Sequence, residues 1–350
     1  MQVVDLVKLA YQNEFAGGHL IVNEAGSLQR LDSEVRALQA QSSQQAGHAT
    51  ERFESIGNGL CRMNLAMPEP SGIDLATVNR FFVCTAGAVQ GTQQGFRAKL
   101  DILRQYLEAQ QKSDGLAELE SFVTAYDFEN CPPVSHSAIY RESYNPAYRI
   151  VLAAFRDYFA VFCRIDAFLK TNQPLNVAID GYCGSGKSTL ADLLQQIYDG
   201  NVIRMDHFFL PPDLRTAGRL LEPGGNIDYD RFMLEVSAGL QNHQAFEYGV
   251  FNCKIMRLDG NISIRPNRLN IIEGSYSMHP KFRDLYDLKV FMKIDKDEQI
   301  RRIQLRNSPD QLQQFVERWI PMENRYFSAF HIAEHCDLVI SGIVDQQFQD

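Results

Sequence analysis

The spacing of apolar residues along the chain changes near residue 171. Before it, apolar side chains recur every three or four positions, which is the spacing of amphipathic helices. One such set is Leu28, Leu31, Val35 and Leu38. The segment from about 147 to 170 is apolar nearly all round, which predicts a helix buried between the two halves of the chain. Residues 1–170 are therefore expected to form a helix-rich domain.

After Pro174 short apolar runs alternate with helical stretches. The first run, Leu175 to Ile179, leads into a glycine-rich loop and a helical pattern from Ser188 to Tyr198. Further apolar runs lie at 201–205, 269–272, 288–294 and 337–340. This alternation predicts a parallel sheet wrapped by helices, so residues 171–350 are expected to form a doubly wound α/β domain.

Length and charge limit the classes of function. At roughly 150 residues per domain, 350 residues correspond to about two domains. The 34 basic and 43 acidic residues give a net charge of −9, which argues against general binding to nucleic acid or anionic membranes. Seven scattered cysteines without a CxxC pair, and no signal peptide or apolar membrane span, favour a cytoplasmic protein with reduced thiols.

A phosphate-binding motif lies between the first apolar run and the helical pattern that follows it. Residues 181–188 read GYCGSGKS, which fits GxxxxGK[ST] without departure. In this motif the backbone N–H groups and the helix N-terminus face phosphates, the lysine reaches the β- and γ-phosphates, and the hydroxyl binds Mg²⁺. The expected nucleotide-binding residues are Gly181, Gly184, Ser185, Gly186, Lys187, Ser188 and Thr189.

Several blocks around this motif resemble the uridine kinase family of P-loop nucleoside kinases. The blocks are 179–190, 204–209, 226–230, 271–276 and 301–306. The resemblance spans about residues 175–342 and implies a P-loop kinase fold, ATP and Mg²⁺ as cofactors, and phosphoryl transfer to a hydroxyl group.

Two acidic residues end apolar runs, where the carboxyl edge of a sheet places ligand sites. Asp206 could accept the proton of an attacking hydroxyl, and the resemblance implies this role with a share in Mg²⁺ binding. A plain strand-end cap is the alternative. Glu273 is expected to face the metal together with Ser188, the alternative being an ordinary loop carboxylate.

Substrate contacts follow from the resemblance and from helix geometry. Asp228 resembles the family's ribose-binding acid and Tyr229 follows it, although Asp228 also suits a helix N-cap. Arg302 and Arg306 lie four residues apart, which suits a lid over the transferring phosphoryl group or a solvated basic face. Residues 251–253 depart from the family's base-framing element. Arg257 or Lys254 is a candidate contact for an acceptor with an anionic or carbonyl group.

Outside this region two clusters are dense in residues common in binding sites. They are residues 14–19 and 136–149, which suit either helix capping or a ligand contact. His331 and His335 lie one helical turn apart, but without a third ligand they favour an ordinary amphipathic helix over a metal site.

The sequence thus predicts an ATP- and Mg²⁺-dependent kinase of a small hydroxylated molecule. A uridine-like or cytidine-like nucleoside is the leading acceptor. The alternatives are another hydroxylated metabolite as acceptor, and a nucleotide-binding regulatory module. No motif separates ATP from GTP, and the sequence allows a homo-oligomer without indicating one.

Overall fold

The computed structural model describes residues 2–18, 21, 23–41, 51–66 and 72–341. The chain divides into two compact units, one within residues 1–159 and one within residues 160–345. This division lies at the start of α8 (Phe159–Leu169), whereas the apolar pattern places a boundary at residue 171. We describe each unit by itself.

Helices make up most of the N-terminal unit, as the apolar spacing predicts. They are α1 (Val3–Phe15), α2 (Glu24–Gln41), α3 (Leu75–Ala88), α4 (Gln93–Ala109), α5 (Ser113–Ala125), α6 (Ala138–Tyr144) and α7 (Ala153–Asp157). Asp74 and Thr92 cap α3 and α4 by accepting hydrogen bonds from backbone N–H groups of the first turn. Val7, Phe96 and Leu119 bury one face each of α1, α4 and α5 in a shared core.

A three-stranded antiparallel sheet in this unit was not predicted. Its strands are β1 (Phe53–Gly57), β2 (Leu60–Asn64) and β3 (Tyr148–Leu152). Asn58 and Gly59, both at positive φ, form the two-residue turn between β1 and β2. The prediction of one helix over 147–170 was therefore wrong, because its first part pairs with β2 and only α7 and α8 are helical.

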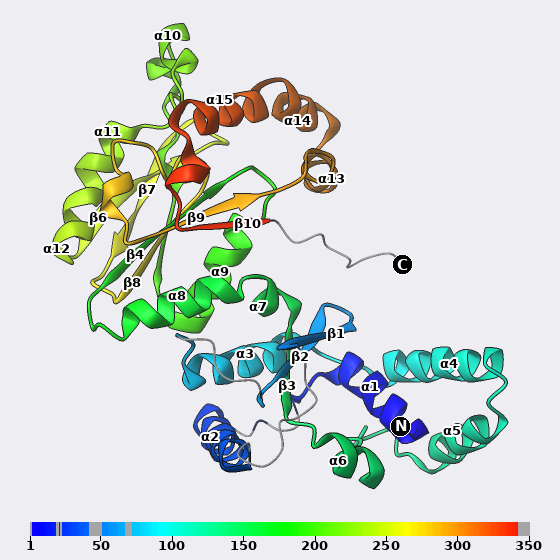
Figure 1. Cartoon of the computed structure of the whole chain (residues 1–350). Helices are drawn as coiled ribbons and strands as arrows, with labels where there is room; N and C mark the ends of the chain where they lie inside the picture. Colours follow the sequence, from blue (N-terminus) through cyan, green and yellow to red (C-terminus); the bar gives the residue numbers. More distant parts are fainter. Residues whose placement is uncertain (1, 19–20, 22, 42–50, 67–71, 342–350) are drawn as a thin grey trace. The chain divides into compact units, whose positions relative to one another are not determined.

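A five-stranded parallel sheet forms the centre of the second unit (Figure 1). Its strands are β4 (Leu175–Gly181), β5 (Asn201–Arg204), β8 (Leu269–Glu273), β9 (Leu288–Lys293) and β10 (Leu338–Ser341), in the order β10-β9-β4-β8-β5. All seven residues of the central strand β4 are buried, which is why it reads as a continuous apolar run. The predicted α/β fold class and its strands are confirmed.

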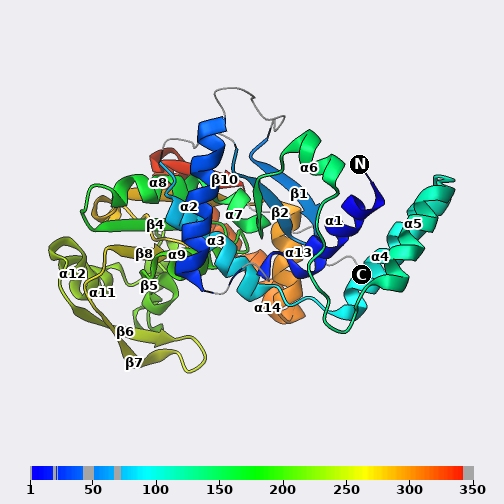
Figure 2. The ribbon, with the colours of Figure 1, turned by 90° about the horizontal axis from the view of Figure 1, so that it is seen from below.

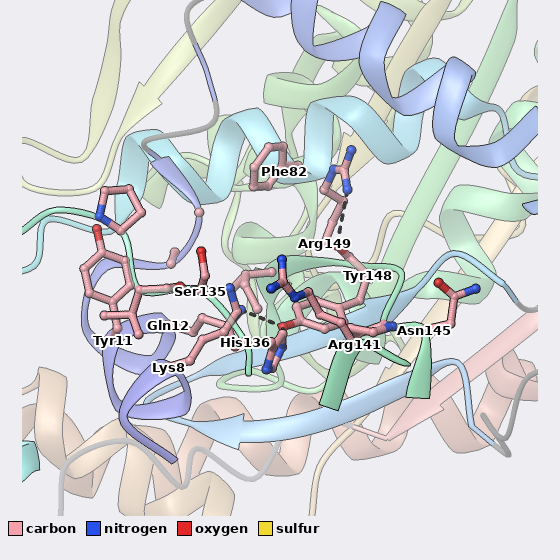
Figure 3. A pocket seen from close by; sticks show the side chains of 16 residues that line it. Lys8, Tyr11, Gln12, Phe82, Ser135, His136, Arg141, Asn145, Tyr148 and Arg149 are labelled. Atoms are coloured by element: carbon pink, nitrogen blue, oxygen red, sulfur yellow. Dashed lines mark hydrogen bonds between the residues drawn. The ribbon is translucent and has the colours of Figure 1, made fainter. Parts of the chain in front are cut away.

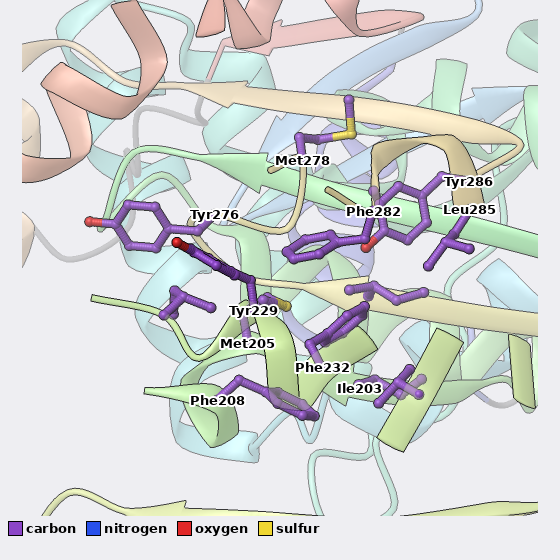
Figure 4. Close-up of a cluster of buried hydrophobic side chains, with 14 of the residues drawn as sticks. Ile203, Met205, Phe208, Tyr229, Phe232, Tyr276, Met278, Phe282, Leu285 and Tyr286 are labelled. Atoms are coloured by element: carbon purple, nitrogen blue, oxygen red, sulfur yellow. The ribbon is translucent and has the colours of Figure 1, made fainter. Parts of the chain in front are cut away.

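Helices cover both faces of this sheet. In Figures 1 and 2, α8 and α9 (Lys187–Tyr198) lie on one side, while α15 (Ile320–Phe330) lies on the other. On the α15 side, Ile203, Phe232 and Tyr326 belong to a large aromatic core, part of which is drawn in Figure 4. The remaining elements are α10 (Ala217–Leu221), α11 (Tyr229–Phe232), α12 (Ala238–Asn242), β6 (Phe246–Asn252), β7 (Arg257–Ile264), α13 (Lys296–Arg306) and α14 (Pro309–Gln314).

No helix among the residues that the structure describes is both long and apolar enough to cross a membrane. All seven cysteines are free thiols.

Candidate active site

The GYCGSGKS segment forms a loop between β4 and α9. Gly181, Gly184 and Gly186 have φ values of +139°, +79° and +98°, which only glycine adopts readily. At Gly181 a Cβ atom would lie 2.2 Å from the Met292 carbonyl oxygen of β9. Glycine therefore allows both the turn of the loop and its close approach to the neighbouring strand.

The polar groups of this loop suit a bound phosphate chain. Lys187, at the start of α9, is buried and donates hydrogen bonds to the Gly181 and Tyr182 carbonyl oxygens at 2.8 and 2.9 Å. The Ser185 hydroxyl and Nη2 of Arg302 are buried at the loop, and neither has a hydrogen-bond partner among the described residues. Because buried polar groups are nearly always paired, these two atoms fit an anionic ligand with several oxygens.

Oxygen ligands for a divalent cation lie beside the loop. Ser188 and Thr189 are exposed in the first turn of α9, and the Ser188 hydroxyl donates to Glu273 Oε1 at 3.0 Å. Glu273 ends β8 and is buried. A hydroxyl and carboxylates are the ligands that Mg²⁺ prefers, so these residues fit a magnesium site.

Asp206 lies near this pair of residues. It sits in a short helical turn (Met205–Phe208) directly after β5, and β5 pairs with β8 so that Arg204 is opposite Glu273. Arg204 also forms an ion pair with Glu273 at 3.1 Å. Burial raises the pKa of Glu273; the charge of Lys187 opposes this effect, and the negative charge of Asp206 reinforces it. Asp206 itself is exposed, so an acceptor hydroxyl can reach it.

The helix α13 lies against the phosphate loop. Arg302 Nη1 donates to the Gly184 carbonyl oxygen at 3.2 Å, and Arg306 Nη2 would lie 3.7 Å from a Cβ atom built on Gly184. Gln299 Nε2 donates to the Cys183 carbonyl oxygen at 3.0 Å. The structure thus brings Arg302 and Arg306 to the loop. Gln299 was not predicted, although its place one turn before Arg302 is a usable signal.

Two buried carboxylates accept hydrogen bonds from backbone N–H groups of the loop. Asp180, at the end of β4, accepts hydrogen bonds from the backbone N–H groups of Gly181, Tyr276 and Met278 and from the Tyr326 hydroxyl. Burial raises its pKa to about 6.

Glu323 on α15 is the second of these carboxylates, and it was not predicted. It accepts from the Cys183 N–H at 3.0 Å and from the Ser275 hydroxyl at 2.6 Å. Glu323 is 140 positions from Cys183 along the chain, so no local pattern in the sequence indicates this contact.

The predicted acceptor residues occupy three different environments. Asp228 is the N-cap of α11 and accepts from the Arg231 N–H at 3.1 Å, and it also lines a cavity of about 490 Å³. Tyr229 is buried, with its ring stacked on His279 at 4.8 Å. Arg257 is exposed at the start of β7, and its side chain forms no hydrogen bond or ion pair with the described residues.

The turn between β6 and β7 lies on the Asp206 side of the unit. Cys253 in this turn has a raised pKa, chiefly through burial and then through the charge of Asp206. His331 is the C-cap of α15 at a positive φ and pairs with Glu334 at 3.2 Å, while His335 lies in a separate short helical turn (Ile332–His335). The expectation of one amphipathic helix through both histidines is therefore wrong, because the left-handed conformation of His331 ends α15. Across the described ranges, no three metal-binding side chains gather into a cluster of histidine, cysteine and carboxylates.

The sequence of the chain is similar to sequences of known kinases. No protein-family model matches the chain. It is 23% identical over 188 residues to the uridine kinase of Bacillus pumilus, covering 48% of this chain and 87% of that protein. It is 24% identical over 187 residues to the uridine kinase of Chlamydia pneumoniae, covering 47% and 81%. The chain resembles uridine kinases.

The chain also has similarity to solved structures. A structure described as a "possible uridine kinase" from Bacillus stearothermophilus has a TM-score of 0.40 and 19% identity, over 52% of this chain and 99% of that one. Shikimate kinase from Bacteroides thetaiotaomicron has a TM-score of 0.27 and 14% identity, over 50% and 91%. The sequence relatives are kinases, which supports a kinase as the class of this protein.

Proposed function

We propose that the protein is an ATP- and Mg²⁺-dependent kinase that phosphorylates a hydroxyl group of a small molecule, with a uridine-like or cytidine-like nucleoside as acceptor. The observation that carries the proposal is the position of Asp206, which is exposed directly after β5, next to the strand that ends in Glu273 and at the same sheet edge as the phosphate loop. A protein that only senses a nucleotide has no need of an acceptor base at this place.

The proposed reaction forms a bond between the acceptor oxygen and the γ-phosphorus of ATP and breaks the bond between that phosphorus and the β–γ bridging oxygen. Asp206 takes the proton of the acceptor hydroxyl. The loop N–H groups and Lys187 hold the phosphates, and Arg302 and Arg306 offset the charge that develops on the transferring group.

The donor set of Ser188, Glu273 and Asp206 would hold Mg²⁺, which screens the phosphate charges and orients them for in-line transfer. These residues act on charge and position without forming a covalent intermediate.

Two observations support a nucleoside acceptor. The curated relatives with the similarity given above are named uridine kinases. Asp228 also lines the 490 Å³ cavity, which is large enough for a nucleoside. Residues 251–253, in contrast, read Phe-Asn-Cys at the turn near Asp206 and depart from the family's base-framing element. This departure favours a changed acceptor, such as another hydroxylated metabolite, as the second candidate.

The test is nucleotide consumption by the full chain with Mg²⁺ across a panel of nucleosides, sugars and other hydroxyl compounds, with ATP and GTP as donors. We expect acceptor-dependent turnover that Lys187→Ala and Asp206→Asn each lower by a factor of at least about 100. Turnover with sugars alone would select the second candidate. Tight ATP binding without turnover on any acceptor would overturn the kinase proposal in favour of a regulatory module.

A further inference from the structure

The N-terminal unit contains a cavity of about 540 Å³ that the proposed kinase function does not use (Figure 3). This volume lies within the range of about 300–1,000 Å³ that is typical of small-molecule sites. Its walls come from α1, from residues 133–136, from α6 and from β3. The cavity therefore brings together residues from both clusters that stand out in the sequence, 14–19 and 136–149; His19 lies outside the described residues.

The charged residues that line the cavity are all basic. Lys8, Arg141 and Arg149 line it, and no aspartate or glutamate does, in a chain whose net charge is −9. Arg149 is paired with Glu34 at 2.8 Å. Lys8 Nζ donates to the Val134 carbonyl oxygen at 3.0 Å, and among the described residues no carboxylate lies within ion-pair distance of Lys8 or Arg141.

The positive charges at this wall repel one another. Burial lowers the pKa of Lys8, and the positive charges of Arg62 and Arg141 lower it further. The negative charge of Asp5 acts in the opposite direction and is weaker than these effects. A bound anion between Lys8 and Arg141 would relieve this repulsion, because opposite charges a few ångströms apart stabilise each other.

A hydrogen-bonded chain fixes the polar side of the cavity. His136 Nδ1 lies 3.3 Å from Asp5, its Nε2 lies 2.6 Å from the Tyr148 hydroxyl, and that hydroxyl accepts from Gln12 at 2.9 Å. Gln12 in turn accepts from Arg62 at 2.8 Å. Since an ionised Asp5 can only accept, His136 donates through Nδ1 and accepts from Tyr148 through Nε2.

These hydrogen bonds fix the side chains of His136, Tyr148 and Gln12 in the wall of the cavity. Each polar group of this hydrogen-bonded series already has a partner inside the protein. Of the basic residues in the wall, Arg149 is paired with Glu34, and Lys8 and Arg141 form no ion pair with the described residues, which leaves their charges to an anion. Tyr11, Phe82 and Ile150 supply an apolar side to the same cavity. A site with an apolar body and a few fixed polar groups is the usual form of a metabolite pocket.

We propose that this cavity binds a small organic anion, a phosphate or carboxylate group carried on an apolar or aromatic body, with Lys8 and Arg141 contacting the anionic group. This site lies within the N-terminal unit, and no residue of the P-loop lines it.

The test uses the full chain carrying Lys187→Ala, which weakens phosphate binding at the P-loop. Isothermal titration is performed with phenyl phosphate, benzoate, inorganic phosphate and the neutral benzyl alcohol. We expect saturable binding of phenyl phosphate or benzoate that weakens as salt is added, and little binding of benzyl alcohol. Whether phosphate or carboxylate binds more tightly identifies the anionic group.

Variants separate this site from general charge effects. Arg141→Ala removes an exposed side chain, and Lys8→Met keeps the apolar stem; each is expected to weaken binding about ten- to a hundredfold. The matched control is Arg36→Ala, which removes an exposed arginine of α2 paired with Asp32. Circular dichroism checks that each variant is folded.

Three results would overturn the proposal. They are no saturable binding of any anionic probe up to about 10 mM, well above the range of specific sites, equal binding of benzyl alcohol, and equal affinities of the Arg141→Ala and Arg36→Ala proteins.

Discussion

Arg302 offers the sharpest test of the site, because its three guanidinium nitrogens have different surroundings. Nε donates to Glu298 at 2.7 Å, Nη1 donates to the Gly184 carbonyl oxygen, and Nη2 is buried with no partner in the part of the chain that the structure describes. The side chain is only 12% exposed. The geometry therefore holds two nitrogens in place and leaves the third without a hydrogen bond to the described residues, so that it can bind a ligand at the phosphate loop.

Replacing Arg302 by alanine should therefore lower kcat more than it lowers stability. Removal of one donor that faces developing charge typically costs a factor of about 10²–10³ in kcat. The lost contacts to Glu298 and Gly184 should lower Tm by only a few degrees, since about 1 kcal/mol corresponds to roughly 2–4 °C for a domain of the size of the unit within residues 160–345. Arg302→Lys should fall between, because an ammonium keeps the charge but not the forked geometry.

The neighbouring Arg301 provides the control. It pairs with the same Glu298 at 2.6 Å, yet its side chain is 49% exposed. Steady-state rates with saturating ATP and acceptor should be near wild type for Arg301→Ala. If both alanine variants lose the same activity, or if Arg302→Ala keeps kcat within about threefold of wild type, the assignment of Arg302 to the transferring group is refuted.

Four further predictions concern stability and ligands. Asp180→Asn should destabilise the protein by about 1–3 kcal/mol in urea unfolding, because its amide cannot accept every hydrogen bond that the carboxylate accepts; an unchanged midpoint would contradict this. Gly181→Ala should abolish ATP binding measured by titration, because the new Cβ atom would lie 2.2 Å from the Met292 carbonyl oxygen. Gly218→Ala should leave ATP binding unchanged, because a Cβ atom at Gly218 would have open space around it. Glu273→Gln should raise the Mg²⁺ concentration needed for half-maximal rate; an unchanged Mg²⁺ curve would remove this residue from the metal site. Burial lowers the pKa of His136 to about 4 in the folded protein. As the pH falls, His136 therefore takes up a proton in the unfolded chain, near pH 6.5, before it does so in the folded protein. Calorimetric stability should therefore fall as pH drops from about 6.5 to 4, and His136→Gln should flatten this slope; an unaltered slope would contradict the reasoning.

The sequence was most informative where the structure is locally encoded. The strands of the parallel sheet are buried on both faces, so each appears as a short apolar run, and the GxxxxGK[ST] spacing locates the loop between a strand and a helix. The sequence also predicted that Asp206 and Glu273 lie close to each other, since the carboxyl ends of parallel strands lie at one edge of the sheet.

What the sequence did not reveal depends on pairing between distant segments. The strand β3 lies at the start of an apolar stretch that continues as helix, and only its pairing with β2 separates the two. Asn58 and Gly59 form a common hairpin turn, but the exposed residues of β1 give little alternation to support it. Glu323 reaches the phosphate loop only through the packing of α15, and the cavity around Lys8 likewise requires α1 and β3 to meet.

The most direct test of the central claim is mass spectrometry of the products formed from Mg²⁺, ATP and a nucleoside such as uridine or cytidine. The proposed function requires a nucleoside monophosphate and ADP in equal amounts from the wild-type chain, and neither from Asp206→Asn. Release of ADP with no phosphorylated nucleoside, at the same rate with and without acceptor, would contradict it.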